Sequence, residues 1–420
     1  MIETMHLLEG VTLRCVRDSR FKQAALSIQF VRPMSREEAA LNALLPAVLL
    51  RGSRHYPDIR AITNRLDELY GASVGNIVRR IGDYQTTGLY CGFIEDRYAL
   101  EGDRILEPMM ELVRELLLEP LLENGVFRRD FVEGEKKNLI AVIDAERNDK
   151  RSYAGSQMIR LMCREDSYGI PRLGDRDSVA AATPEELYAH YRRVLRESRV
   201  DVFYAGSAEA ETVAKALRPL FDELDRSYVN LPGQTAYHPV EPQAHTDVMD
   251  VAQGKLCMGF TTPVTLRDPE FVTMQLLNLI LGAGMTSKLF MQVREKLSLC
   301  YDIGSGYHGA KGILSVTAGI DSHQKDRVVR EILAQLEECQ AGHITEAELE
   351  AAKQAMYSSL RSIHDSPGSI EGFYATAALS GMALTPEQYR DAVERTTVEQ
   401  IAAAARDIQL HTVYFLKGVQ

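Results

Sequence analysis

The chain has 420 residues, of which 45% are hydrophobic and 25% charged, and its formal net charge is −11. This length can bury more than one core, so we expect two or more domains. Nucleic-acid binding needs clustered Lys and Arg, and the absence of such a cluster in an acidic chain excludes that role. The acidic charge either serves solubility alone or lines a chamber that favours basic or extended peptides.

The sequence also bears on the cellular compartment. The first twenty residues contain acidic side chains and no apolar run of the length that a signal peptide needs. No stretch approaches the ~18–20 apolar residues of a membrane span. The six cysteines are scattered without C-x-x-C pairs, as expected for reduced thiols. We therefore predict a cytoplasmic protein that does not associate with membranes.

The first half predicts strands and helices in alternation. Ser35 and Glu38 form the pattern of a capping box at the start of a helix, and Pro46 lies eleven residues into it. A proline there removes a backbone hydrogen bond to Asn42 and costs about 3 kcal/mol, or it kinks the helix. The other predicted elements are a strand at 25–30, a helix at 59–69, a long helix in the region 132–154, a helix capped by Thr183 and a strand at 200–206.

The second half repeats this plan about 200 residues later. Its predicted elements are a strand at 255–260, a helix at 268–281, helices capped by Thr345 and Thr397, and a strand at 412–418. The segment 229–245 is rich in Pro and Gln and lacks periodicity, so it is the predicted linker. We expect two α+β domains, 1–228 and 246–420, each an antiparallel sheet covered by helices on one face.

The segment 282–307, GAGMTSKLFMQVREKLSLCYDIGSGY, is the most informative part of the chain. Leu289, Val293 and Leu297 mark an apolar helical stripe, and the residues from Cys300 to 305 alternate as in a strand. Arg294 and Tyr301 bracket the junction. From periodicity alone, Arg294 is a charge on the helix surface and Tyr301 an aromatic residue of the core.

This block closely resembles the C-terminal-half signature of the M16 family, the pitrilysin, insulinase and mitochondrial-processing-peptidase-like proteins. In that family the Arg and Tyr of an LF…RE…L.Y pattern hold the substrate peptide. The resemblance implies that Arg294 and Tyr301 bind substrate. It also implies two homologous domains in one chain, which in bacterial members pair with a second chain to enclose a chamber.

The family's zinc motif, H-x-x-E-H, precedes a K/R-G-[ST]…Y-P turn. The turn is present here at 51–57, and counting back places the catalytic positions on Ala43, Pro46 and Ala47. Their side chains offer zinc no lone pair and supply no carboxylate to activate water. The third family ligand would fall near 144–146. The resemblance therefore implies no catalytic residue and no metal in this chain, with zinc only in a partner subunit.

Three other candidate sites carry less weight. A Cys300 and His308 nucleophile pair is not expected, because Cys300 occupies a family position that is ordinarily small and apolar. The family's substrate-binding Asn on the first-half edge strand is replaced by Val74, and we do not transfer its role to Asn76. The glycines near 282–288 lack the order of residues of a phosphate loop.

The sequence thus predicts a catalytically silent M16-like subunit that binds peptide and pairs with an H-x-x-E-H paralogue as a heterodimer to form a zinc peptidase. The segment from Lys137 to Ala154 also resembles a subfamily of firmicute-type bacteria associated with the 5-aminopentanol modification of translation elongation factor P. One alternative is a homodimeric scaffold or peptide-binding protein without peptidase function. Another is an autonomous hydrolase with unusual ligands.

Overall fold

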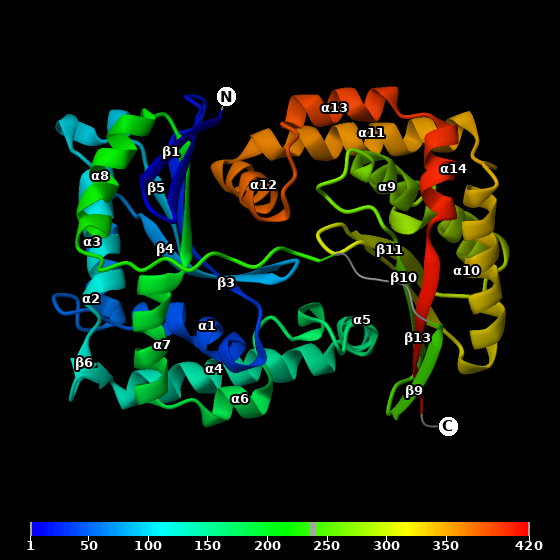
Figure 1. Ribbon diagram of the computed structural model, residues 1–420, viewed down its shortest axis with the longest axis horizontal. Coiled ribbons are helices and arrows are strands. Elements are labelled where there is room, and N and C mark those ends of the chain that lie inside the picture. Colours follow the sequence, from blue (N-terminus) through cyan, green and yellow to red (C-terminus); the bar gives the residue numbers. More distant parts are fainter. Residues whose placement is uncertain (1, 236–240, 419–420) are drawn as a thin grey trace. The chain divides into compact units, whose positions relative to one another are not determined.

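The computed structural model describes residues 2–235 and 241–418 (Figure 1). Residues 236–240 of the predicted linker lie outside the described residues. The chain packs into two compact units. Unit 1 consists of Met1–Asp144, Ile170–Gly233 and His364–Thr376, and unit 2 consists of Ala145–Gly169, Gln234–Ile363 and Ala377–Gln420. Each unit therefore includes a segment from the other half of the chain, an exchange that the predicted division by sequence position does not contain.

Unit 1 is built on a sheet that, in the described residues, has six strands in the order β1-β2-β8-β3-β5-β4. These strands are β1 (Ile2–Leu8), β2 (Val11–Arg17), β3 (Gln23–Pro33), β4 (Ser73–Ile81), β5 (Tyr84–Ile94) and β8 (Arg199–Gly206). Its helices are α1 (Arg36–Leu49), α2 (Ile59–Glu68), α3 (Leu106–Leu118), most of α4 (Arg129–Asn148), α6 (Arg176–Ala181), α7 (Pro184–Glu197), α8 (Ala210–Asp222) and the first part of α12 (Pro367–Ser380). A small hairpin consists of β6 (Leu122–Glu123) and β7 (Val126–Phe127).

Unit 2 is built on a sheet whose described strands follow the order β11-β12-β10-β13-β9. They are β9 (Gln243–Met249), β10 (Gly254–Thr261), β11 (Asp302–His308), β12 (Ile313–Ile320) and β13 (Gln409–Gly418). Its helices are α5 (Lys150–Met162), α9 (Phe271–Asn278), α10 (Lys325–Gln340), α11 (Glu346–Ser362), the end of α12 (Pro367–Ser380), α13 (Pro386–Arg395) and α14 (Val398–Arg406). No helix in the described ranges is long and apolar enough to cross a membrane.

The predicted α+β class and internal repeat are confirmed by the strand orders. The series β4-β5-β3-β8-β2 of unit 1 corresponds to β11-β12-β10-β13-β9 of unit 2. Thr183 and Thr397 both cap the helices that lead into β8 and β13, as predicted, and each forms a capping box. The sheets are not wholly antiparallel as predicted, because β2 runs parallel to β8 and β9 parallel to β13.

Alternate residues of β3 separate the two faces of the unit 1 sheet. Leu26, Ile28 and Phe30 are buried in the main core with residues of α1, α3, α7 and α8. Ser27 and Gln29 point to the other face and are also buried. There the carboxylate of Glu371, on α12, accepts hydrogen bonds from Ser27 Oγ at 2.7 Å and from Gln29 Nε2 at 2.8 Å. A segment from the C-terminal half thus covers the second face of this sheet.

The second face of the unit 2 sheet is covered by α5, from the N-terminal half. Met158 and Met162 of α5 form a buried cluster with Cys257 of β10 and Tyr414 of β13. The region 132–154, predicted as one long helix, is broken at Asp149 between α4 and α5. The Asp149 carboxylate accepts hydrogen bonds from the backbone N–H groups of Arg151 and Ser152, so it caps the start of a new helix, α5.

Candidate functional site

Helix α1 carries the three positions at which the family resemblance places a zinc centre. Ala43 and Pro46 are buried and Ala47 is half-buried. Methyl groups and a pyrrolidine ring have no lone pair for a metal and no carboxylate to take a proton from water. The residues present therefore do not fit zinc, and we assign no metal-dependent step to them.

The region predicted to hold the third ligand lies at the end of α4. The carboxylate of Asp144 is 3.4 Å from the guanidinium of Arg176, and that of Glu146 accepts a hydrogen bond from Ser156 Oγ at 2.5 Å. Both acidic residues are exposed. In the part of the chain that the structure describes, no three His, Cys, Asp or Glu side chains are grouped as metal ligands.

Helix α1 continues through Pro46 without ending there. Pro46 has no N–H, so the carbonyl of Asn42 loses the donor it would have in an unbroken helix. Thr87 Oγ1, on β5, donates a hydrogen bond to that carbonyl at 2.7 Å. The sheet therefore satisfies the buried carbonyl that the proline leaves without a partner, which offsets part of the cost of a proline inside a helix.

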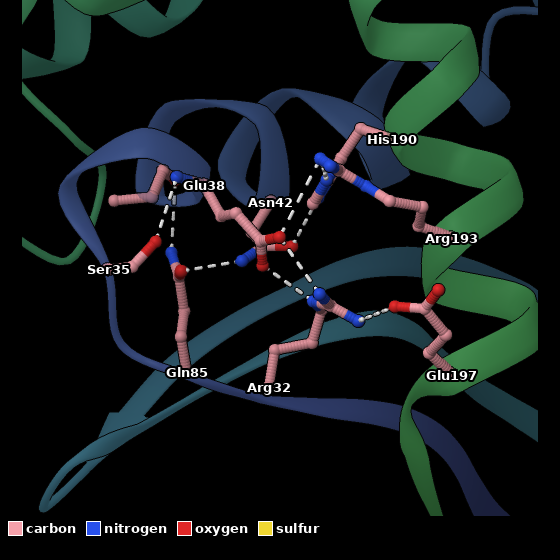
Figure 2. A network of polar contacts seen from close by, with 9 residues as sticks. Arg32, Ser35, Glu38, Asn42, Gln85, His190, Arg193 and Glu197 are labelled. Atoms are coloured by element: carbon pink, nitrogen blue, oxygen red, sulfur yellow. Dashed lines mark hydrogen bonds and ion pairs between the residues drawn. The ribbon is translucent and has the colours of Figure 1, made fainter. Parts of the chain in front are cut away.

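A buried polar network surrounds the side chain of Asn42 (Figure 2). Asn42 Nδ2 donates to Gln85 Oε1 at 2.9 Å, and His190 Nε2 lies 2.8 Å from Asn42 Oδ1. Gln85 Nε2 donates in turn to the carbonyls of Ala39 and Arg172. These contacts join α1, β5 and α7. The sequence analysis did not predict these contacts. The signal that could have indicated them is a polar residue on the apolar face of a helix, as at positions 42 and 190.

The contacts of His190 fix its protonation. Asn42 Oδ1 can only accept a hydrogen bond, so His190 Nε2 carries the proton. His190 Nδ1 then accepts from Arg193 Nη2 at 3.2 Å. Burial lowers the pKa of His190 to about 4, so the imidazole is neutral at pH 7. The side chain is a structural element of the network and is not placed to act as a metal ligand.

The predicted capping box at the start of α1 forms only in part. Ser35 Oγ accepts a hydrogen bond from the Glu38 N–H at 3.2 Å, as predicted. The Glu38 carboxylate, however, is bound by both Arg32 nitrogens, at 2.6 and 2.8 Å (Figure 2). A bidentate ion pair with a half-buried guanidinium is stronger than a hydrogen bond from the Ser35 N–H, so it takes the carboxylate.

Replacing Thr87 by Val should lower the free energy of unfolding by about 1–3 kcal/mol, because the buried Asn42 carbonyl loses its donor. Thr86 is the matched control, since its buried hydroxyl has no hydrogen-bond partner among the described residues. In a Pro46→Ala background, the new N–H can donate to Asn42, so the penalty of Thr87→Val should shrink. Denaturant unfolding of the wild type, Thr87→Val, Pro46→Ala and the double variant measures this. If Thr87→Val lowered the free energy of unfolding equally with and without Pro46, the proposed compensation would be contradicted.

The free energy of unfolding should fall as the pH drops from about 6.5 toward 4.5. The unfolded chain then binds a proton at His190, whereas the folded chain, with a pKa of about 4, does not. The loss approaches about 1.4 kcal/mol per pH unit. In His190→Gln, which keeps a donor for Asn42, this component should be absent. The pKa of Glu38 is also lowered, because the bound Arg32 outweighs the effect of burial, which raises it. The stability that this carboxylate contributes is lost at lower pH, below that window.

The C-terminal signature block folds as helix, turn and strand, with two helical segments of unusual geometry. These are η4 (Leu279–Ala283) and η5 (Leu289–Lys296), both π-helical. The N–H of Leu297 donates to the carbonyl of Gln292, five residues earlier, at 3.0 Å. Turns of π-helix are rare and occur frequently at functional sites. The strand begins at Asp302, two residues later than predicted.

Arg294 lies on η5 with its guanidinium stacked over the ring of Phe290, 4.6 Å from the ring centroid. Its nearest carboxylate is that of Glu295 at 3.7 Å, and 40% of its side-chain surface is exposed. Stacking restricts the guanidinium without using its hydrogen-bond donors. Its assignment as a substrate-binding residue stays a prediction, with a geometry that leaves it open to a ligand.

Tyr301 follows a strained turn. Ser298 has φ of 49°, in the left-handed region that residues other than glycine rarely adopt. The Tyr301 N–H donates to the carbonyl of Gly319 at 2.9 Å, and its hydroxyl lies 3.3 Å from Asp321 Oδ1. The side chain is 55% exposed, so Tyr301 is not a core aromatic residue. No contact among the described residues joins it directly to Arg294.

Cys300 lies between these two residues but is not an activated thiol. Burial raises its pKa to about 11, and the nearby charge of Arg294 opposes this only in part. His308 lies at the far end of β11, about 20 Å along the strand, and its Nε2 is 3.1 Å from Ser315 Oγ. The structure therefore does not bring the two together as a catalytic pair.

Strand β4 is the unit 1 counterpart of β11. Val74 and Asn76 both lie on it, opposite Cys91 and Leu89 of the buried core. They share a face of the sheet, as the period of a strand predicts. Asn76 is exposed and Val74 is half-buried. Val74 has no polar group to bind a peptide.

Comparisons with known proteins agree with this architecture. A family model described as "Peptidase M16 inactive domain" matches residues 181–356. The chain is 30% identical over 411 residues to the probable inactive metalloprotease YmfF of Bacillus subtilis (strain 168), covering 98% of this chain and 96% of that protein. It superposes on a conserved protein from Enterococcus faecalis V583 with a TM-score of 0.93 at 26% identity, covering 100% of this chain and 99% of that one. A peptidase M16 inactive domain from Pseudomonas fluorescens, 18% identical, shares the fold with a TM-score of 0.82 over 100% of this chain and 98% of its own.

Proposed function

Because this chain belongs to the M16 peptidase family as a member without the H-x-x-E-H motif, we propose that it is a non-catalytic subunit that binds peptide and pairs with an active paralogue. The observation that carries the proposal is the contrast between the two halves. Positions 43, 46 and 47 offer no metal ligand. Arg294, on a π-helix, keeps 40% of its side-chain surface exposed, and Tyr301, after a strained turn, is 55% exposed.

The two side chains have the chemistry that this role needs. A guanidinium and a phenol hydroxyl both donate hydrogen bonds to peptide carbonyls. Among the described strands, β11 has β12 on one side and none on the other, so an extended peptide can add to its free edge through main-chain hydrogen bonds. Donors at this position can orient a peptide bond, or stabilise the oxyanion that forms when water attacks it at a centre completed by the partner. The partner's zinc would activate that water.

The proposed setting is the cytoplasm. All six cysteines, which lie among the described residues, are buried free thiols, as expected for a reducing compartment. On the subfamily resemblance of the segment 137–154, we also propose that the complex acts in the 5-aminopentanol modification of elongation factor P.

The double variant Arg294→Ala and Tyr301→Phe should lower the peptidase activity of the assembled complex at least tenfold while the two chains still co-purify. The loss follows from removing two hydrogen bonds to the peptide, each worth about 1 kcal/mol or more. Expressed in place of the native chain, the variant should also leave elongation factor P without the modification, which its intact mass reports.

The matched control combines Lys296→Ala and Tyr98→Phe, which removes an exposed cation of the same helical segment and an exposed tyrosine of unit 1. It should retain activity. Unchanged activity of the Arg294 and Tyr301 variant would rule out the proposed role of these residues. If peptidase activity were lost while elongation factor P kept the mass of its modified form, only the proposed role in that modification would be ruled out.

A further inference from the structure

We propose that Arg151 is a third element of the peptide-binding site, where it binds an acidic group of the peptide and sets substrate preference. This inference rests on the proposed peptide-binding function. Arg151 belongs to α5, the segment that the N-terminal half contributes to unit 2. Nothing in the signature block itself points to it, because it precedes Arg294 by more than 140 residues.

The break at Asp149 is what brings Arg151 to this place. Asp149 caps α5, and Arg151 stands in the first turn of the new helix. A Cβ built on Gly304 of β11 would lie 3.7 Å from Arg151 Nη2 and 3.6 Å from the carbonyl oxygen of Gly282. The guanidinium therefore lies against the backbone of β11 at a residue without a side chain, three positions from Tyr301.

The donors of Arg151 are largely unused. Its closest ion pair is with Asp302 Oδ1 at 3.6 Å, too long for a direct hydrogen bond. Within the described ranges its side chain makes no hydrogen bond, and 55% of its surface is exposed. An Arg that only balanced Asp302 would be expected to approach its carboxylate as closely as Arg32 approaches Glu38, at 2.6 Å.

Two carboxylates lie near Arg151, and neither takes up its side-chain donors. Asp302 lies 3.6 Å from Arg151 and 3.8 Å from Lys255, so it is shared between two cations. The carboxylate of Asp149, whose pKa Arg151 helps to lower, accepts its hydrogen bonds from the Arg151 and Ser152 N–H groups and from Ser152 Oγ. The guanidinium of Arg151 therefore keeps its donors for an added anion.

The geometry also predicts where the acidic group lies. Residues of an extended strand rise about 3.3 Å each, so Gly304 is about 10 Å from Tyr301 along β11. In a peptide added to this edge, the residue with the acidic group would therefore lie about three positions along the peptide from the residue that is next to Tyr301. The group is either the side chain of an Asp or Glu or the terminal carboxylate of the peptide.

The test measures the affinity of the purified full-length chain, with its companion subunit where one co-purifies, for labelled ten-residue extended peptides. One series has an amidated C-terminus and a single Glu or Gln moved along the chain, and a second has a free C-terminal carboxylate and no acidic side chain. The wild type should bind the best Glu peptide about fivefold more tightly than its Gln counterpart, the size of one exposed ion pair of about 1 kcal/mol. Comparison of the two series tells which carboxylate is used.

Arg151→Gln should abolish this preference and leave the affinity for Gln peptides unchanged, and Arg151→Lys should retain part of it. Arg164→Gln is the matched control, because Arg164 is an exposed Arg of the same exchanged segment, and it should keep the full preference. No preference in the wild type, or a preference that survives Arg151→Gln, would overturn the inference and leave the proposed function standing. If the wild type bound none of the peptides, the proposed function would fail and the inference with it.

Discussion

Each sheet of this chain has two faces to cover, and each half of the chain supplies helices for one face of its own sheet. The second face is closed by an exchanged segment, α12 over the sheet of unit 1 and α5 over that of unit 2. On the unit 1 side the contact is a buried carboxylate. Glu371 is paired by both guanidinium nitrogens of Arg79 at 2.9 Å, in addition to its bonds with Ser27 and Gln29. Removing Arg79 would leave the buried carboxylate of Glu371 without its charge partner, which is costly, so this interaction holds the C-terminal segment on the sheet.

The same exchange shapes the candidate site. Because α5 leaves its own half, a residue of the N-terminal segment meets the edge strand that follows the Arg294 and Tyr301 signature. The site is thus assembled from both halves of the chain within one packed unit. Helix α1, in contrast, has become a structural element. Its proline, the Thr87 hydroxyl and the network of Asn42 are explained by packing against the sheet and α7.

The sequence was sufficient for those features that depend on local pattern. The capped helices at Thr183 and Thr397 and the repeat of strands both follow from residue type and spacing. The exchange of α5 and α12 was not predictable in this way, because the Glu371 contacts join residues up to 344 positions apart. The Glu38 carboxylate shows the same limit, since a tertiary ion pair with Arg32 displaced the local cap. The π-helical geometry around Arg294 was also not predicted, because an apolar stripe does not distinguish a π-helix from an α-helix.

The most direct test of the central claim is the composition of the native complex. The chain would be tagged in its source organism, purified gently, and its stoichiometric companions identified by mass spectrometry. The account predicts one companion at about equal molar amount that carries H-x-x-E-H. Recovery of only this chain, as a homodimer without bound zinc, would contradict it and favour a peptide-binding scaffold; about one equivalent of zinc, with activity lost on chelation, would instead favour an autonomous hydrolase.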